Sequence, residues 1–244
     1  MPPFMQQTMI KTSAALITFG ILTLPLSLAH AEGWTGEGSA GIVIVSGNSD
    51  SETVNVGLAL TKKADVWEHT FKFMANSSES DGDKSAESYL AAYNAKYNLD
   101  PKSFLWGDLR YLDDKFDSFD GITTIGAGYG YRISNSDELK WNVSAGIGYR
   151  DTEIESTGED ISGVAFIGES DFTLKLSETT EFIDVFRVEA TADNSYLQNI
   201  AGISVAMSDV LSLKVTYDVR YNTDPAAGDT STDSITAVSV VYKL

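Results

Sequence analysis

Residues that could catalyse a reaction are scarce in this sequence. It contains no cysteine and two histidines, His30 and His69. Nucleophilic catalysis needs a nucleophile beside a base, and zinc sites need several nitrogen or sulfur ligands. His30 lies in a predicted export signal, and His69 is predicted to face outward beside Trp67 and Phe71, without a serine or carboxylate partner. The sequence therefore predicts no enzyme, no cofactor and no metal centre.

A glycine motif near the start of the mature chain has a structural explanation. Residues 36–41 match G-x-G-x-x-G. A dinucleotide fingerprint follows a strand and opens a helix, whereas this motif opens a predicted strand. We interpret it as small residues lining the inside of a barrel.

Several polar segments between the predicted strands are rich in carboxylates. Closely spaced oxygen ligands can bind divalent cations, but the D-x-D-x-D-G calcium motif is absent. Weak cation binding is one interpretation, and solvated loop charge is the favoured one. The residues concerned are Glu79, Asp81, Asp83, Asp113, Asp114, Asp117, Asp120, Asp151, Glu153, Glu155, Glu159 and Asp160.

Ten charged residues occupy alternate positions of predicted strands, on the face opposite the apolar side chains. They are Arg110, Arg132, Arg150, Arg187, Arg220, Asp108, Glu169, Asp171, Glu189 and Asp218. Charge facing hydrocarbon is costly, so these residues are lumen-lining candidates. Two interpretations remain open, a structural ion-pair network and a solute path. The ion-pair network is favoured, because opposite charges in a narrow barrel must pair or stay hydrated.

The elements that position these residues are recognised by period-two alternation. In residues 211–222, for example, Leu213, Val215 and Tyr217 alternate with Lys214 and Thr216. Successive strand side chains point to opposite faces, so such segments are strands with one apolar and one polar face. Twelve segments follow the pattern: 34–45, 52–62, 66–76, 86–98, 103–113, 121–133, 138–150, 162–176, 180–191, 196–207, 210–222 and 233–244. Asp184 falls on the apolar face of the ninth, which predicts a register slip or bulge there.

The connections alternate between short turns and longer polar segments. The longer ones include 77–85, 151–161 and 223–232. Short turns at one end and long loops at the other are typical of outer-membrane barrels, and an even strand number places both termini at the periplasmic end.

Aromatic residues support this assignment. Outward positions near the short turns carry Trp67, Tyr97, Tyr131, Trp141 and Tyr242. Outward positions near the long loops carry Tyr89, Tyr111, Tyr149 and Tyr221. Two girdles fit two membrane interfaces, whereas a soluble β-sandwich, the alternative fold, has no need of them. The predicted fold class is an all-β transmembrane antiparallel barrel of about twelve strands.

The first 31 residues resemble a cleaved signal peptide. Lys11 precedes an apolar run over 14–28, and Ala29-His30-Ala31 is a small-x-small cleavage site. An uncleaved anchor is the alternative. Cleavage would remove one of 17 basic residues, leaving 16 against 35 acidic ones and a formal charge of −19 on residues 32–244. This acidic balance argues against nucleic-acid binding and against adsorption to anionic lipid. The expected location is the outer membrane, with its lipid and assembly machinery as partners.

Inward glycines suggest how wide the lumen is. Five of them, Gly126, Gly128, Gly130, Gly146 and Gly148, lie on neighbouring predicted strands. They should admit side chains from the opposite wall. Together with arginine–carboxylate pairs, they predict a closed or very narrow barrel.

Several motifs in order resemble the YdiY-like family of uncharacterised, salt-induced outer-membrane proteins. They are Ser46-Gly47-Asn48-Ser49, Arg110-Tyr111 followed by residues 114–117, the Gly-Tyr segment 126–132, and the tail from Asp233 through Val241-Tyr242-Lys243-Leu244. The resemblance implies an outer-membrane barrel with no established activity and a link to salt or osmotic stress. This chain ends in Leu244, where such proteins commonly end in an aromatic residue.

Three function classes follow. The leading hypothesis is envelope maintenance or a narrow channel for small solutes. The alternative is a surface recognition or adhesion barrel that acts through its acidic loops. An outer-membrane lipid-modifying enzyme is disfavoured, because His69 is the one histidine that remains after the predicted signal peptide is removed.

Overall fold

A computed structural model describes residues 33–45, 51–81, 83–115, 121–154, 158–225 and 231–244. The predicted signal peptide, 1–31, lies outside these residues. Within the described part, no helix is long and apolar enough to cross a membrane.

Twelve antiparallel strands form a closed barrel, as the alternation predicts. The strands are β1 (Trp34–Val45), β2 (Ser51–Ala64), β3 (Trp67–Ser80), β4 (Asp83–Asn98), β5 (Ser103–Asp114), β6 (Ile122–Asn135), β7 (Leu139–Asp151), β10 (Gly163–Lys175), β11 (Thr180–Ala190), β12 (Ser195–Ala206), β13 (Leu211–Asn222) and β14 (Thr232–Lys243). A small separate hairpin, β8 (Glu153–Ile154) and β9 (Glu159–Asp160), lies between β7 and β10.

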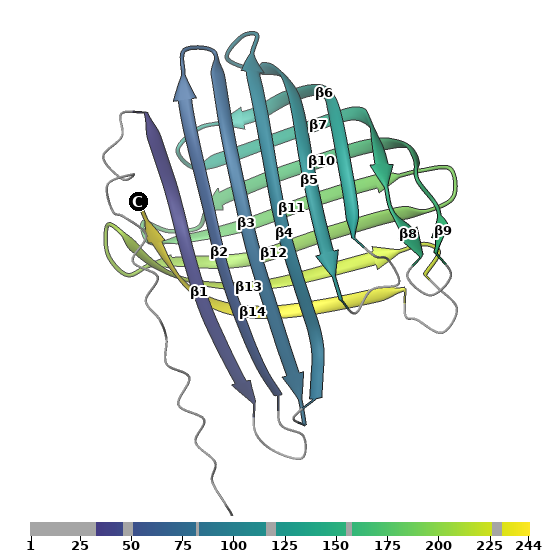
Figure 1. Ribbon diagram of the computed structural model, residues 1–244. Helices are drawn as coiled ribbons and strands as arrows, with labels where there is room; N and C mark the ends of the chain where they lie inside the picture. Colours follow the sequence, from purple (N-terminus) through teal and green to yellow (C-terminus); the bar gives the residue numbers. More distant parts are fainter. Residues whose placement is uncertain (1–32, 46–50, 82, 116–120, 155–157, 226–230) are drawn as a thin grey trace, which may run out of the picture.

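Each barrel strand pairs with its neighbours in the chain, and β14 closes the barrel against β1. This closing seam is short: its register runs from Glu37 opposite Lys243 to Ala40 opposite Val240. Figure 1 shows β1–β5 passing steeply across the front and β10–β14 crossing behind them. The two walls therefore face each other at a large angle.

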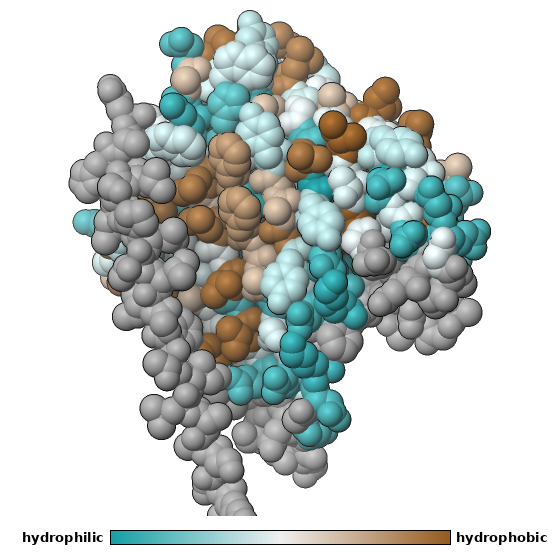
Figure 2. Space-filling model, viewed as in Figure 1, coloured by the Kyte–Doolittle hydropathy of each residue, from teal (hydrophilic) through white to brown (hydrophobic). Residues whose placement is uncertain are grey.

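The outer face is apolar and carries both predicted aromatic girdles. Outward side chains such as Ile147 and Val164, each 71% exposed, face away from the barrel. Trp67 and Tyr97 form an edge-on pair at the short-turn end, with ring centroids 5.0 Å apart. At the other end Tyr89, Tyr111 and Tyr149 are exposed. Figure 2 shows brown apolar side chains grouped over the middle of this wall and a teal tip at the lower end.

Three sequence expectations about the strands are wrong. Gly36 and Gly38 of the G-x-G-x-x-G motif do not line the inside of the barrel, because they lie in register with the outward Leu60 and Leu58 of β2. The polar segment 77–85 is not a long loop, because β3 and β4 continue as a hairpin to Ser80 and Asp83. β11 has no register slip at Asp184; irregularities occur instead between Ser78 and Glu79 and between Arg132 and Ser134. Alternation fails as a guide outside the membrane, where neither face of a strand needs to be apolar.

The inward glycines of β6 and β7 form a thin wall that bulky side chains cover. Phe104, Trp106, Ala165 and Ile167 are buried together against it. These residues belong to the flanking strands β5 and β10, so the expectation that the opposite wall would fill this space is wrong. A Cβ at Gly146 would lie 2.6 Å from Cζ2 of Trp106.

We expect Gly128→Ala to destabilise the barrel by about 1–3 kcal/mol, the usual cost of overpacking a filled core. A Cβ there would lie 2.8 Å from Cζ2 of Trp106 and collide with the Ala145 carbonyl oxygen. Gly38→Ala is the matched control, because nothing lies within 4 Å of its added Cβ. Loss of the heat-resistant folded band on a gel, followed against temperature, measures the difference. Equal melting of both variants would contradict this packing.

Candidate functional site in the barrel lumen

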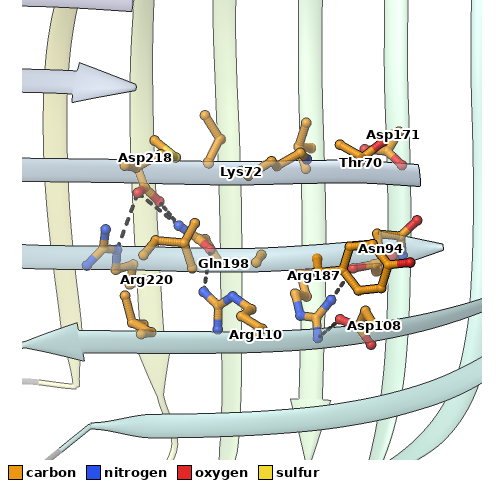
Figure 3. Close-up of a pocket in the computed structure, with 18 of the residues that line it drawn as sticks. Thr70, Lys72, Asn94, Asp108, Arg110, Asp171, Arg187, Gln198, Asp218 and Arg220 are labelled. Carbon is orange, nitrogen blue, oxygen red and sulfur yellow. Dashed lines mark hydrogen bonds and ion pairs between the residues drawn. The ribbon is translucent and has the colours of Figure 1, made fainter. Parts of the chain in front are cut away.

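The centre of the lumen is crossed by a cluster of ion pairs around Arg187. This β11 residue lies 3.0 Å from the Asp108 carboxylate on β5, measured from Nη2 to Oδ2. Its Nε donates to Oε1 of Glu189 at 2.6 Å, and its Nη1 pairs with Glu169 on β10. The Arg187 guanidinium therefore holds three carboxylates, and its pair with Asp108 joins β11 to β5, four strands away around the barrel (Figure 3).

A second arginine meets the same cluster. Arg110 on β5 approaches Oε1 of Glu189 at 3.5 Å, and the Glu189 side chain is fully buried. The Thr124 hydroxyl donates to the other Glu189 oxygen at 2.8 Å. A buried carboxylate is stable only when it is paired and hydrogen-bonded, and Glu189 meets both conditions.

A third arginine closes the cluster on the β13 side. Arg220 Nη1 lies 2.6 Å from Asp114, and its Nε lies 3.3 Å from Asp218. Both carboxylate oxygens of Asp218 also accept from Nε2 of Gln198, at 3.0 Å for Oδ1 and 2.9 Å for Oδ2. The side chains of β5 thus reach β11 and β13, so the lumen is bridged along this side.

Beside the bridge lies a cavity of about 350 Å³ between β3–β4 and β10–β13. Lys72 on β3 and Asp171 on β10 line it (Figure 3). Lys96 on β4 lines it as well. Asp171 also lines a second cavity of about 400 Å³, which reaches the short-turn residues Glu178 and Thr179. The two cavities therefore adjoin and lead toward the short-turn end.

The structure places the predicted lumen residues at three levels. Asp108, Arg110, Glu169, Arg187, Glu189, Asp218 and Arg220 form the central cluster. Arg132 lies apart, hydrogen-bonded to Asn98 and 4.8 Å above the Phe104 ring. Arg150 is buried toward the long-loop end and donates to Asn194 at 3.1 Å.

Sequence reasoning missed four participants. Lys72 and Lys96 face inward by the same parity that identified the arginines, so their strands already carried the signal. Gln198 could have been found in the same way, as an inward neighbour of Arg187. Asp114 was assigned to a loop, but it belongs to β5 and turns toward Arg220.

The acidic loop segments are the places where the sequence allowed weak cation binding. Among the described residues, no three His, Cys, Asp or Glu side chains are grouped as metal ligands. Asp160 is engaged by Ser162, whose hydroxyl and amide hold the pKa of that carboxyl below its ordinary value. Asp117, Asp120 and Glu155 lie outside the described residues.

His69 faces outward, as the parity predicts. Its ring stacks on Trp67 with centroids 5.7 Å apart, and Nδ1 lies 2.9 Å from the Tyr93 hydroxyl. The imidazole and the phenol both face outward, away from the charged side chains of the lumen. The arrangement fits an interfacial histidine.

Residues 38–244 match a family described as "Protein of unknown function, DUF481". The chain belongs to this family. This DUF481 barrel is 24% identical to the uncharacterized protein YdiY of Escherichia coli (strain K12) over 213 residues, which cover 86% of this chain and 82% of that protein. The resemblance to YdiY-like proteins is thereby confirmed.

Two solved structures match this chain at low sequence identity. An outer membrane channel from Pseudomonas putida F1 matches with a TM-score of 0.50 and 10% identity, covering 86% of this chain and 94% of that one. The NanC porin matches with a TM-score of 0.45 and 10% identity, covering 86% and 97%. With its closed sheet, apolar outer face and two girdles, the DUF481 barrel is an outer-membrane β-barrel.

Proposed function

We propose that this barrel is a narrow conduit for small polar solutes that is closed at rest. The observation that carries the proposal is the link from Arg187 on β11 to Asp108 on β5, which spans the lumen. Barrels with open aqueous pores typically have about 16–18 strands, and this one has twelve. Ion pairs across so small a bore leave little room for a permanent channel.

The two adjoining cavities support a path rather than a solid plug. Together they extend from the short-turn end to the central cluster, and both are lined by polar and charged side chains. A solute would have to separate or slip past the Arg187 pairs to continue. The pore is therefore expected to open briefly and with small conductance.

Recordings from purified protein in planar bilayers test the proposal. Rare, small openings are expected, and large stable openings would place the protein with general porins. Silence both in the wild type and after removal of Arg187 would favour envelope maintenance. The link to salt stress, the dependence on outer-membrane assembly machinery and the absence of catalysis are part of the same proposal and need separate tests.

The lysines of the cavity should set its ion preference. Neither Lys72 nor Lys96 forms an ion pair with another described residue, so their charge is available to a passing solute. We expect anion preference in the wild type. Lys72→Glu combined with Lys96→Glu should shift the permeability ratio about tenfold toward cations, equivalent to ~1.4 kcal/mol. The reversal potential in a salt gradient measures the shift, and an unchanged potential would contradict this path.

The direction of the path follows from the orientation of the barrel. We expect Glu159→Cys, at the long-loop end, to react with an impermeant maleimide on intact cells. Glu178→Cys, in the turn after β10, should react only after the outer membrane is permeabilised. The chain has no other cysteine, so the labelling is unambiguous. The reverse labelling pattern would mean that the short turns, and not the long loops, face the outside of the cell.

A further inference from the structure

The outer face of the barrel carries a polar pair where most lipid-facing side chains are apolar. Asp184 on β11 lies in register between Phe172 and Ala201, and these positions face outward. Asn199 on β12 shares that face, and its Nδ2 donates to Oδ2 of Asp184 at 3.1 Å. The pair is therefore formed on the surface that faces the membrane.

The pair lies within the hydrocarbon layer rather than at its edge. Asp184 is the fifth residue of β11, counted from the short-turn end. A tilted strand climbs roughly 2.5 Å per residue along the membrane normal, so Asp184 stands about 10 Å from that end. Trp141, which marks the girdle on this side, is only the third residue of its strand.

Other charged outward residues stand nearer the membrane surfaces. Lys62 is level with Trp34, whereas Glu87, Asp113 and Asp151 lie beyond the girdle tyrosines of their strands. Among the described residues, Asp184 is thus the charged side chain placed between the girdles. A carboxylate there costs free energy unless donors surround it.

The existing hydrogen bond leaves the pair incompletely satisfied. A carboxylate can accept several hydrogen bonds, and the Asn199 amide has a second N–H to donate. Lipid tails provide neither donors nor acceptors. The neighbouring outward side chain Ser170 already accepts a bond from Nε1 of Trp141 at 3.1 Å.

We propose that this surface binds a second copy of the same chain. Barrels in one membrane share an orientation, so two copies can be related by a two-fold axis along the membrane normal. Such an axis beside the pair brings each Asp184 carboxylate to the Asn199 amide of the other copy, at the same depth. The surface is self-complementary because it carries both a donor and an acceptor.

One small side chain beside the pair eases the close approach that this contact needs. Ala201 on β12 lies directly opposite Asp184 on the outward face, whereas Phe172 lies opposite it on β10. Small residues beside polar ones are typical of interfaces between membrane-spanning segments. The proposal is independent of whether the lumen conducts.

Cysteine cross-linking tests the interface directly, since the chain contains no cysteine. Ala201→Cys should give a disulfide-linked dimer in oxidised native membranes. Ala127→Cys is the matched control, because Ala127 is an outward alanine on β6, four strands away from β12 around the barrel. A cross-link of equal strength at both positions, no cross-link at Ala201, or a cross-linked product of another mass would overturn the proposal.

A second measurement does not depend on cross-linking. Asp184→Leu combined with Asn199→Leu should raise the dimer dissociation constant in detergent about tenfold, as judged by light scattering. The heat-modifiable gel shift must persist, which shows that the barrel still folds. A wild type that is monomeric at every concentration tested would refute the second copy.

Discussion

Arg187→Met is expected to convert a nearly silent barrel into a conducting one and to destabilise it. Methionine is close to arginine in length but carries no charge, so Asp108, Glu169 and Glu189 lose their shared partner. Breaking a buried ion pair from one side costs about 3–5 kcal/mol. The Arg187–Asp108 bridge is lost with it, while the Arg110–Glu189 and Arg220–Asp114 pairs remain, and repulsion among the carboxylates should widen the bore.

Two measurements follow this variant: single-channel conductance in planar bilayers, and the urea concentration at which the folded band is lost. Arg132→Met is the control, because Arg132 contacts Asn98 and Phe104 away from the central cluster. Adding Asp108→Asn to Arg187→Met should restore part of the stability by removing one of the repelling charges. A silent and fully stable Arg187→Met barrel would show that the bridge neither closes nor stabilises the lumen.

Ala145→Arg is expected to destabilise the barrel by about 2–4 kcal/mol, the cost of an arginine facing lipid near the bilayer midplane. Ala145 lies on the outer face of β7, midway between Trp141 and Tyr149. The adjacent Ser144→Arg should be much milder, because position 144 faces the lumen opposite Glu169. An arginine there gains a carboxylate partner.

Reversible unfolding in lipid vesicles, monitored by tryptophan fluorescence, compares the two arginine variants. They differ by one position in the chain and stand at nearly the same depth, so only the face differs. Equal losses of stability would mean that β7 does not present position 145 to lipid, and would contradict the register of the whole wall.

Parity along the strands predicts which face of its strand a side chain lies on, because successive residues of a strand must face opposite sides. It could not predict the partners. The pairing of Arg187 with Asp108 joins strands far apart in the chain, and it depends on how the walls of the barrel cross. Arg132 and Arg150 share the inward parity but stand too near the strand ends to reach the central cluster.

The error at Asp184 has a related cause. The expectation of a register slip assumed that a carboxylate cannot face lipid, so the strand was thought to shift. The structure keeps the register and pairs Asp184 with Asn199 from the next strand instead. No single-strand pattern reveals such a partner, since it depends on the register between two strands.

The short seam between β1 and β14 has a mechanical consequence. Its register covers the four pairs from Glu37–Lys243 to Ala40–Val240, whereas the register of β1 with β2 runs from Trp34–Lys62 to Val45–Ser51. A closed sheet under tension tears where the fewest backbone hydrogen bonds resist. When the barrel is pulled, heated or bent by a deforming membrane, we expect β1 and β14 to separate first. The remaining hairpins should stay paired.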